Sequence, residues 1–135
     1  MTIPTSNRHN WRSGFEGHIA YLLEEAGVDY EYETVKIKYV KPSRIATYTP
    51  DFILPNGIIV EAKGQFVTAD RQKHLLIREQ YPDVDIRIIF GRSTTKIGKR
   101  SKTSYGDWCV AKGIKFADKV IPAQWIEEPK KPLGL

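Results

Sequence analysis

The sequence lacks the features by which membrane and secreted proteins are recognised. No apolar run approaches the roughly 20 residues that a membrane-spanning helix needs. Residues 1–10 are polar and lack the apolar stretch of a secretory signal. Cys109 is the single cysteine, so the chain has no internal disulfide. These absences favour a protein that works in a reducing cytoplasm, with no membrane partner.

Two stretches, residues 34–49 and 86–104, contain no acidic side chain, although the whole chain carries both signs of charge. The formal net charge is +5, from 21 Lys and Arg against 16 Asp and Glu. Basic stretches of this kind suit a polyanion such as nucleic acid, but two solvated faces would give the same pattern. Our candidate DNA-binding residues, in these stretches and elsewhere, are Arg12, Lys36, Lys38, Lys41, Arg44, Arg71, His74, Arg92, Lys96, Lys99, Arg100 and Lys102.

The length of 135 residues and the hydrophobic content of 41% suit one compact domain. We expect this domain over residues 13–128, between a flexible N-terminal arm over 1–12 and a mobile C-terminal tail over 129–135. In chain order the patterns predict a helix over 13–26, strands over 30–40, 47–54 and 58–63, a helix over 70–81, a strand over 86–90, a helix over 104–113 and a short helix after Pro122. This order predicts an α/β fold in which helices flank a mixed sheet.

The segment 55–57, Pro-Asn-Gly, fits a three-residue hairpin turn between two strands. Counting outward from this turn sets Asp51 opposite Glu61, and directly paired residues share a face of the sheet. Lys63 follows Glu61 by two positions and shares that face too. A two-residue turn would instead set Asp51 opposite Ala62 and separate the carboxylates. The convergence of the three charged side chains therefore depends on the strand register.

Two opposed carboxylates on neighbouring strands repel each other unless a cation lies between them. Mg²⁺ prefers oxygen ligands, lowers the pKa of a bound water and neutralises charge on a phosphate under attack. Lys63 is then placed to orient or deprotonate that water, or to stabilise the charge that develops on the phosphate. The alternative is an exposed rim with an ordinary Lys–Glu pair. That alternative does not explain why charged residues interrupt the apolar run at 58–60, so the spacing favours a metal site.

The sequence Pro50-Asp51, followed after a gap by Glu61-Ala62-Lys63, resembles the PD-(D/E)xK nuclease signature. A wider likeness, over about residues 11–131, resembles the bacteriophage endonuclease I family of junction-resolving enzymes. The segments that carry it are 12–16 (RSGFE), 48–52 (YTPDF), 54–57 (LPNG), 74–80 (HLLIREQ), 103–106 (TSYG) and 113–119 (GIKFADK).

This resemblance implies a restriction-endonuclease-like fold, with a nuclease domain over 13–128 that works as an intimate, segment-exchanged homodimer. It implies hydrolysis of four-way (Holliday) junctions and other branched DNA by paired nicks that leave 5′-phosphates. A divalent metal is expected, Mg²⁺ with Mn²⁺ as a substitute, at one or two ions per site. The expected location is the cytoplasm of an infected bacterial host.

Carried over residue by residue, the family's acids fall on Glu16, Asp51 and Glu61, and its lysine falls on Lys63. These four are our candidate catalytic residues, and the three acids are the candidate metal ligands. Glu16 also has an alternative role, because Ser13 and Glu16 have the spacing of a helix-capping box. The next position is Gly17, where the family pattern has a second acid, so this chain offers one carboxylate fewer there.

Three other functions remain open from the residues alone, one of which is a basic structural protein that binds nucleic acid incidentally. A nuclease of the same fold could act on mismatched DNA or on a specific duplex sequence. A non-catalytic DNA-binding module would share the basic stretches but would not need the carboxylates.

Overall fold

The structure, a computed structural model, describes residues 11–41 and 44–135. Within these residues, no helix combines the length and the apolar character needed to cross a membrane. The elements in chain order are α1 (Gly14–Glu25), β1 (Glu31–Tyr32), β2 (Ile37–Lys41), β3 (Arg44–Tyr48), β4 (Phe52–Ile53), β5 (Ile59–Lys63), α2 (Thr68–Gln80), β6 (Ile86–Phe90), α3 (Tyr105–Lys112), β7 (Phe116–Asp118) and α4 (Ala123–Glu127).

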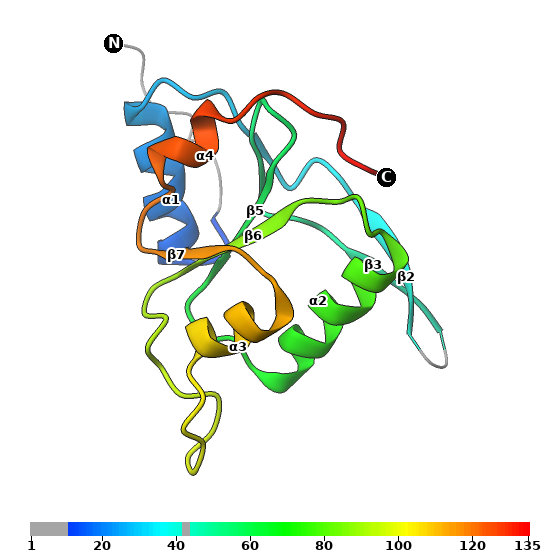
Figure 1. Ribbon diagram of the computed structural model, residues 1–135. Coiled ribbons are helices and arrows are strands. Elements are labelled where there is room, and N and C mark those ends of the chain that lie inside the picture. The colour runs from blue at the N-terminus through cyan, green and yellow to red at the C-terminus, as the bar shows by residue number, and fades with distance from the viewer. Residues whose placement is uncertain (1–10, 42–43) are drawn as a thin grey trace.

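A five-stranded sheet in the order β1-β4-β5-β6-β7 forms the centre of the molecule. β4 pairs antiparallel with β1 and with β5, whereas β5, β6 and β7 run parallel. The helices α1 and α4 lie over one face, and α2 and α3 lie over the other (Figure 1). The predicted α/β fold with a mixed sheet flanked by helices is therefore confirmed.

The alternation of side chains along β5 explains why both faces are covered. Val60 and Ala62 pack in one cluster with Leu23 of α1 and Trp125 of α4. Ile59, which points the other way, packs in a second cluster with residues of α2 such as Ile77. Burial of both faces is typical of strands with parallel neighbours. Glu61 and Lys63 are therefore the only charged residues of a strand that is otherwise apolar.

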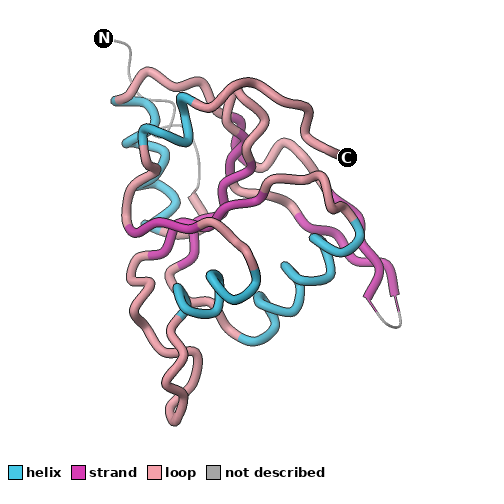
Figure 2. Tube along the Cα trace, viewed as in Figure 1, coloured by secondary structure: helices cyan, strands magenta, loops and turns pink. Residues whose placement is uncertain are grey.

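Two predicted strands, 30–40 and 47–54, are each divided between two sheets. β2 and β3 form a separate antiparallel hairpin, which lies to one side of the five-stranded sheet (Figure 2). The first break lies at Glu33, whose φ of 53° turns the chain out of the extended conformation. The second break lies at Pro50, which has no N–H to donate to a strand ladder. The breaks release the segments around Glu33 and Asp51 from regular pairing.

The strand β7 was not predicted from the sequence. It has three residues, none of them buried, and it follows Gly113, which ends α3 in the left-handed conformation. Its pairing with β6 sets Ile88 beside Phe116. So short a strand carries too little periodicity to be read without its partner.

The two chain ends were expected to be loose. Residues 1–10 of the N-terminal arm lie outside the described residues. The tail over 129–135 contacts the rest of the molecule: Lys131 donates its backbone N–H to Asn56 O at 2.9 Å, and Leu133 packs against the cluster around Ile77. The mobility of the tail stays a prediction.

Candidate active site

The hairpin turn between β4 and β5 sets the register on which the site depends. Leu54 donates its N–H to Ile58 O at 2.9 Å, and Gly57 takes a φ of 92°, which favours glycine. Phe52 then pairs with Val60. This is the register predicted for the three-residue turn, and it excludes the two-residue alternative.

Asp51 and Glu61 lie side by side just beyond that ladder. The Asp51 N–H donates to Glu61 Oε1 at 3.3 Å, and the Ala62 N–H donates to Asp51 Oδ2 at 3.0 Å. The Tyr48 hydroxyl donates to the same Glu61 oxygen at 2.8 Å. Asp51 and Glu61 are 3% and 5% exposed. The two carboxyl groups are therefore buried, and hydrogen bonds fix their positions.

Both carboxyl groups line one cavity of about 220 Å³. The cavity is lined by all four side chains that the sequence nominated as catalytic, together with residues from the segment before β4 and from α2. The full lining is Arg12, Glu16, Thr47, Tyr48, Thr49, Asp51, Glu61, Ala62, Lys63 and Lys73. The structure thus brings the candidate catalytic residues together within one chain.

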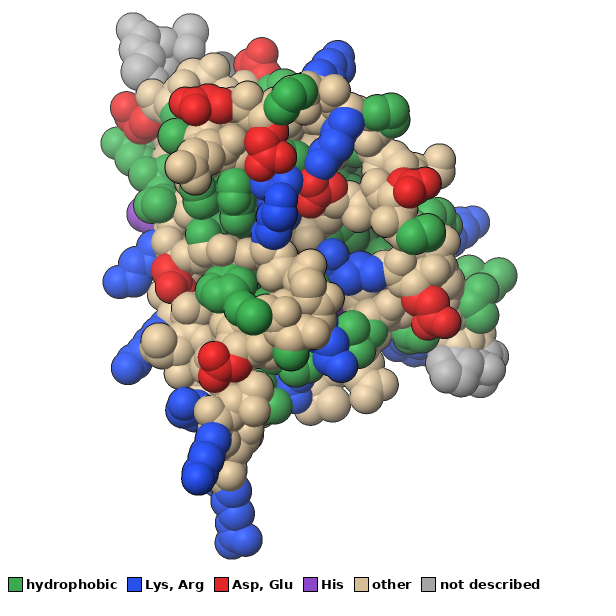
Figure 3. Space-filling model, in the orientation of Figure 1, with side chains coloured by type: hydrophobic (Ala, Val, Ile, Leu, Met, Phe, Trp, Pro, Cys, Tyr) green, Lys and Arg blue, Asp and Glu red, His purple; other side chains and the backbone are tan. Residues whose placement is uncertain are grey.

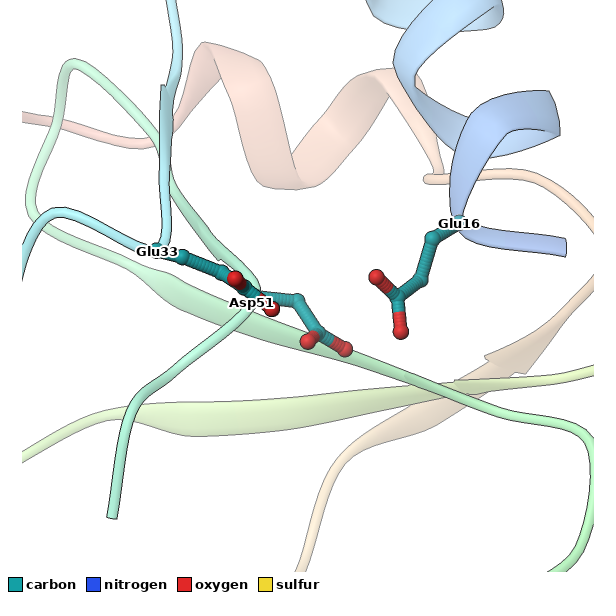
Figure 4. Close-up of side chains that lie close together, drawn as sticks. All are labelled: Glu16, Glu33 and Asp51. Carbon is teal, nitrogen blue, oxygen red and sulfur yellow. The ribbon is translucent and has the colours of Figure 1, made fainter. Parts of the chain in front are cut away.

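Glu16 enters the site from the start of α1. Carboxylate oxygens of Glu16, Glu33 and Asp51 lie within 4.8 Å of one another (Figure 4). The backbone N–H of Glu16 donates a hydrogen bond to Ser13 Oγ at 3.1 Å, so the side chain of Ser13 caps the helix. The Glu16 carboxylate accepts a hydrogen bond from the Tyr32 hydroxyl instead. Ser13 therefore caps α1 without a return bond from the Glu16 carboxylate, and that carboxylate lines the cavity instead.

Glu33 was missed by the sequence analysis, which placed it inside a continuous strand. Its N–H donates to Asp51 O at 3.0 Å, which draws the two acids together. Its carboxylate forms an ion pair with Arg12 at 3.4 Å. A non-glycine residue at positive φ is uncommon, and such conformations cluster at functional sites. No Gly or Pro marks the break in the sequence, so the pattern held no local signal.

The acidic cluster is costly without a cation. Burial first, and then the charge of Glu61, raise the pKa of Asp51 to about 8, against the lowering effect of the Ala62 N–H. Burial also raises the pKa of Glu61, although Lys63 and the Tyr48 hydroxyl oppose this. Clustered carboxylate oxygens are the donors that Mg²⁺ prefers, and a bound cation would favour their ionised forms. The residues present therefore fit a divalent metal ion.

Lys63 lies at the end of β5, where two acids flank its ammonium. Lys63 Nζ is 3.9 Å from Glu61 Oε2 and 3.3 Å from Asp70 Oδ1 of α2. The spacing along β5 predicts the first neighbour, whereas nothing in the sequence pattern pointed to Asp70. Its signal was faint, because an acid in the first turn of a helix is common for other reasons.

The candidate DNA-binding residues divide into exposed and buried groups. Two of them, His74 and Arg71, are buried. The others are exposed or half-buried in the structure: Arg12, Lys36, Lys38, Lys41, Arg44, Arg92, Lys96, Lys99, Arg100 and Lys102.

His74 is 0% exposed, with its ring 5.5 Å from that of Tyr48 and 5.9 Å from that of Phe66. Arg71 donates to the Phe66 carbonyl at 2.6 Å. With Ile77, these two residues form the buried stripe of α2, at three-residue spacing. That spacing was a readable signal. In this arrangement neither side chain is open to DNA, and their assignment as DNA contacts stays a prediction that the burial opposes.

The basic loop 91–104 begins beside the active site. Gly91 donates its N–H to the carbonyl of Lys63 at 3.3 Å, because the parallel strands β5 and β6 end at the same edge of the sheet. Further out, a bridge between Lys96 and Ser104 closes the loop on itself. Lys and Arg side chains extend along this projection (Figure 3). The cations of this loop thus lie on a projection that starts at the edge where Lys63 ends.

Comparison with known proteins assigns a function to this geometry. The phage endonuclease I family matches residues 3–135. Endonuclease I of Escherichia phage T7 is 59% identical over 121 residues, which cover 90% of this chain and 81% of the relative. Endodeoxyribonuclease 1 of Enterobacteria phage T3 is 52% identical over 121 residues, which cover 90% of this chain and 80% of the relative.

The fold, the acidic cavity and these relatives together define an endodeoxyribonuclease, a hydrolase that acts on DNA. Its four nominated catalytic side chains line a single cavity. The chain belongs to the phage endonuclease I family.

Proposed function

We propose that the protein is a Mg²⁺-dependent, structure-selective endonuclease. It resolves four-way (Holliday) junctions and other branched DNA by paired phosphodiester hydrolysis, as a homodimer in the cytoplasm of an infected bacterial host. The observation that carries the proposal is the convergence of Asp51, Glu61 and Lys63, with Glu16, on one cavity. The family relationship supports the choice of DNA as the substrate.

Asp51, Glu16 and Glu61 are the proposed metal ligands, and the position of Glu33 adds a fourth candidate. One or two Mg²⁺ ions, or Mn²⁺ as a substitute, would supply a more acidic water and offset the charge of the phosphate. The Tyr48 hydroxyl holds Glu61 in a fixed orientation. The carboxylates therefore provide a preorganised set of oxygen donors, which reduces the reorganisation needed in the reaction.

Lys63 acts on the attacking water or on the phosphate. Its ammonium lies between Glu61 and Asp70, so its position is restricted. In the hydrolysis, the water oxygen bonds to phosphorus, the bond from phosphorus to the 3′ oxygen breaks, and that oxygen takes up a proton. The products are a 5′-phosphate and a 3′-hydroxyl. Lys63 stabilises the negative charge that builds up on the phosphate in this step.

The exposed cations support binding of the DNA backbone. Lys36 and Lys38 alternate with buried residues along the β2 segment, so both point away from the core. The basic loop 91–104 adds a second surface at the edge of the sheet where Lys63 lies. Contacts of this kind position a duplex without reading its bases, and selection then rests on shape and deformability.

The homodimer is proposed because resolution of one four-way junction needs two nicks. The described chain has one cavity with the complete set of nominated residues. Resolution of a symmetric junction needs two nicks at related positions, and two copies related by a two-fold axis supply them. Exchange of segments between the subunits is part of this proposal.

The test of the proposal compares a four-way junction with a linear duplex of identical sequence, with Mg²⁺ and with a chelator. We expect paired nicks in the junction, only when Mg²⁺ is present. Glu61→Gln should bind the junction and fail to cut it. Normal cutting by this variant would overturn the site assignment, and equal cutting of the duplex would favour a duplex-acting nuclease of the same fold.

A further inference from the structure

A second lysine, Lys73 of α2, lines the active-site cavity. It is half-buried, and its ammonium lies 5.5 Å from the centre of the Tyr48 ring. Among the residues that the structure describes, no carboxylate forms an ion pair with it.

Lys73 and Lys63 differ in how their charges are balanced. Glu61 and Asp70 flank the ammonium of Lys63. Asp70 and Lys73 are three positions apart on α2 and so lie on the same side of the helix. On α2, Asp70 therefore pairs with Lys63, whereas Lys73 lines the cavity. The charge of Lys73 remains available for an anion that enters from outside.

The contact with Tyr48 leaves the donors of Lys73 available. An ammonium group has three N–H donors, and an aromatic face attracts it without accepting all of them. The Tyr48 ring is itself held, because its hydroxyl donates to Glu61. Lys73 is therefore restrained at the cavity and can still donate hydrogen bonds to a ligand.

We propose that Lys73 binds a backbone phosphate of the DNA strand that enters the cavity, as a substrate-binding residue distinct from Lys63. This inference rests on the proposed function, because it takes DNA cleaved at this cavity as the ligand. A phosphate that approaches Glu16, Asp51 and Glu61 is repelled by their charges. A cation without a carboxylate partner offsets that repulsion and helps to align the strand.

The rival role for Lys73 is to neutralise Glu61. The charge of Lys73 lowers the pKa of Glu61, after the effects of burial, Lys63 and Tyr48. If this were its whole role, removal of the Glu61 charge would also remove the need for Lys73. The two roles therefore separate in a protein that already carries Glu61→Gln.

The experiment measures binding of a labelled four-way junction by Glu61→Gln and by Glu61→Gln/Lys73→Gln, over a series of salt concentrations. The loss of one charged hydrogen bond to phosphate should weaken binding roughly tenfold. The slope of log affinity against log salt should fall by about 0.9. Lys73→Arg in the same background should bind nearly as well as the Glu61→Gln parent, because it keeps the charge.

The matched control is Lys112→Gln in the same background, which removes an exposed lysine that does not line the cavity. It should change affinity by much less than Lys73→Gln does. Equal effects of the two variants, or no effect of Lys73→Gln, would overturn the inference, as would failure of Lys73→Arg to retain binding. Thermal melting of each variant checks that it is folded. Failure of the proposed function is recognised separately, as the absence of Mg²⁺-dependent cleavage by the unsubstituted protein.

Discussion

Asp70 Oδ1 lies 3.3 Å from Lys63 Nζ. The short connection between β5 and α2 brings the first turn of the helix back to the end of the strand, so an acid of the helix faces the lysine of the strand. Asp70 therefore restricts where the Lys63 ammonium can lie, although it does not line the cavity itself. We therefore assign Asp70 the role of positioning the Lys63 ammonium.

Asp70→Asn should lower the single-turnover cleavage rate about tenfold with little change in junction affinity, because a loosened Lys63 is less often correctly placed. The matched control is Glu79→Gln, which removes an exposed acid from the same helix. The single-turnover cleavage rates of the two variants, measured at saturating protein, show whether Asp70 has a specific role. Equal rates would show that Asp70 contributes only general charge.

Glu33 should contribute to metal binding. Because its carboxylate lies with those of Glu16 and Asp51, Glu33→Gln should weaken Mn²⁺ binding about tenfold or more, as measured by calorimetry on the metal-free protein. Glu25→Gln removes an exposed acid at the end of α1 and should leave Mn²⁺ affinity unchanged. Wild-type affinity in Glu33→Gln would restrict this residue to its ion pair with Arg12.

The buried acids should make the metal-free protein less stable as the pH rises. The pKa of Asp51 is raised to about 8 by burial and then by Glu61. An aspartate in the unfolded chain has a pKa of about 4. Between these values the folded state holds the proton more tightly, so the free energy of unfolding falls as pH rises, by up to about 1.4 kcal/mol per pH unit for one proton.

Urea denaturation in EDTA from pH 4 to pH 8 measures this slope. Asp51→Asn should flatten it, and part of the slope should remain because the pKa of Glu61 is raised too. Asp29→Asn, at an exposed position, should leave the slope unchanged. A metal-free protein whose stability rises over this range would contradict the electrostatic account of the site.

Arg87 should anchor the C-terminal segment. It is 1% exposed, and it donates to Asp85 at 2.8 and 2.9 Å and to Glu128 at 2.6 and 2.8 Å. Glu128→Gln removes one of its two anionic partners and should lower Tm by several degrees. Glu127→Gln, its exposed neighbour, is the matched control. An unchanged Tm in Glu128→Gln would show that Asp85 alone balances this arginine.

The part of the site that the sequence predicted is the part encoded locally. The turn 55–57 carries its own conformational preferences, and the register of Asp51, Glu61 and Lys63 follows from it by counting. The alternation of Ile37 and Tyr39 with Lys36 and Lys38 is likewise a local pattern, and it matches the side chains of β2 that are buried. Such features need only neighbouring residues, and the structure bears them out.

The features that were missed depend on contacts between distant segments. Glu33 joins the acids because the chain turns there, and that turn is fixed by its bond to Asp51 and not by a Gly or Pro. β7 exists only through its pairing with β6. The burial of His74, by contrast, matches a local pattern, the three-residue spacing of the buried residues Arg71, His74 and Ile77 on α2.

The most direct test of the account is the cleavage of a labelled four-way junction by the unsubstituted protein and by Asp51→Asn, under single-turnover conditions, with binding measured in parallel. The account predicts cutting by the unsubstituted protein only with Mg²⁺. In Asp51→Asn it predicts a cleavage rate reduced by a factor of about 100 or more, with binding of the junction retained. Cutting in the presence of a chelator, or cutting by Asp51→Asn at the unsubstituted rate, would contradict it.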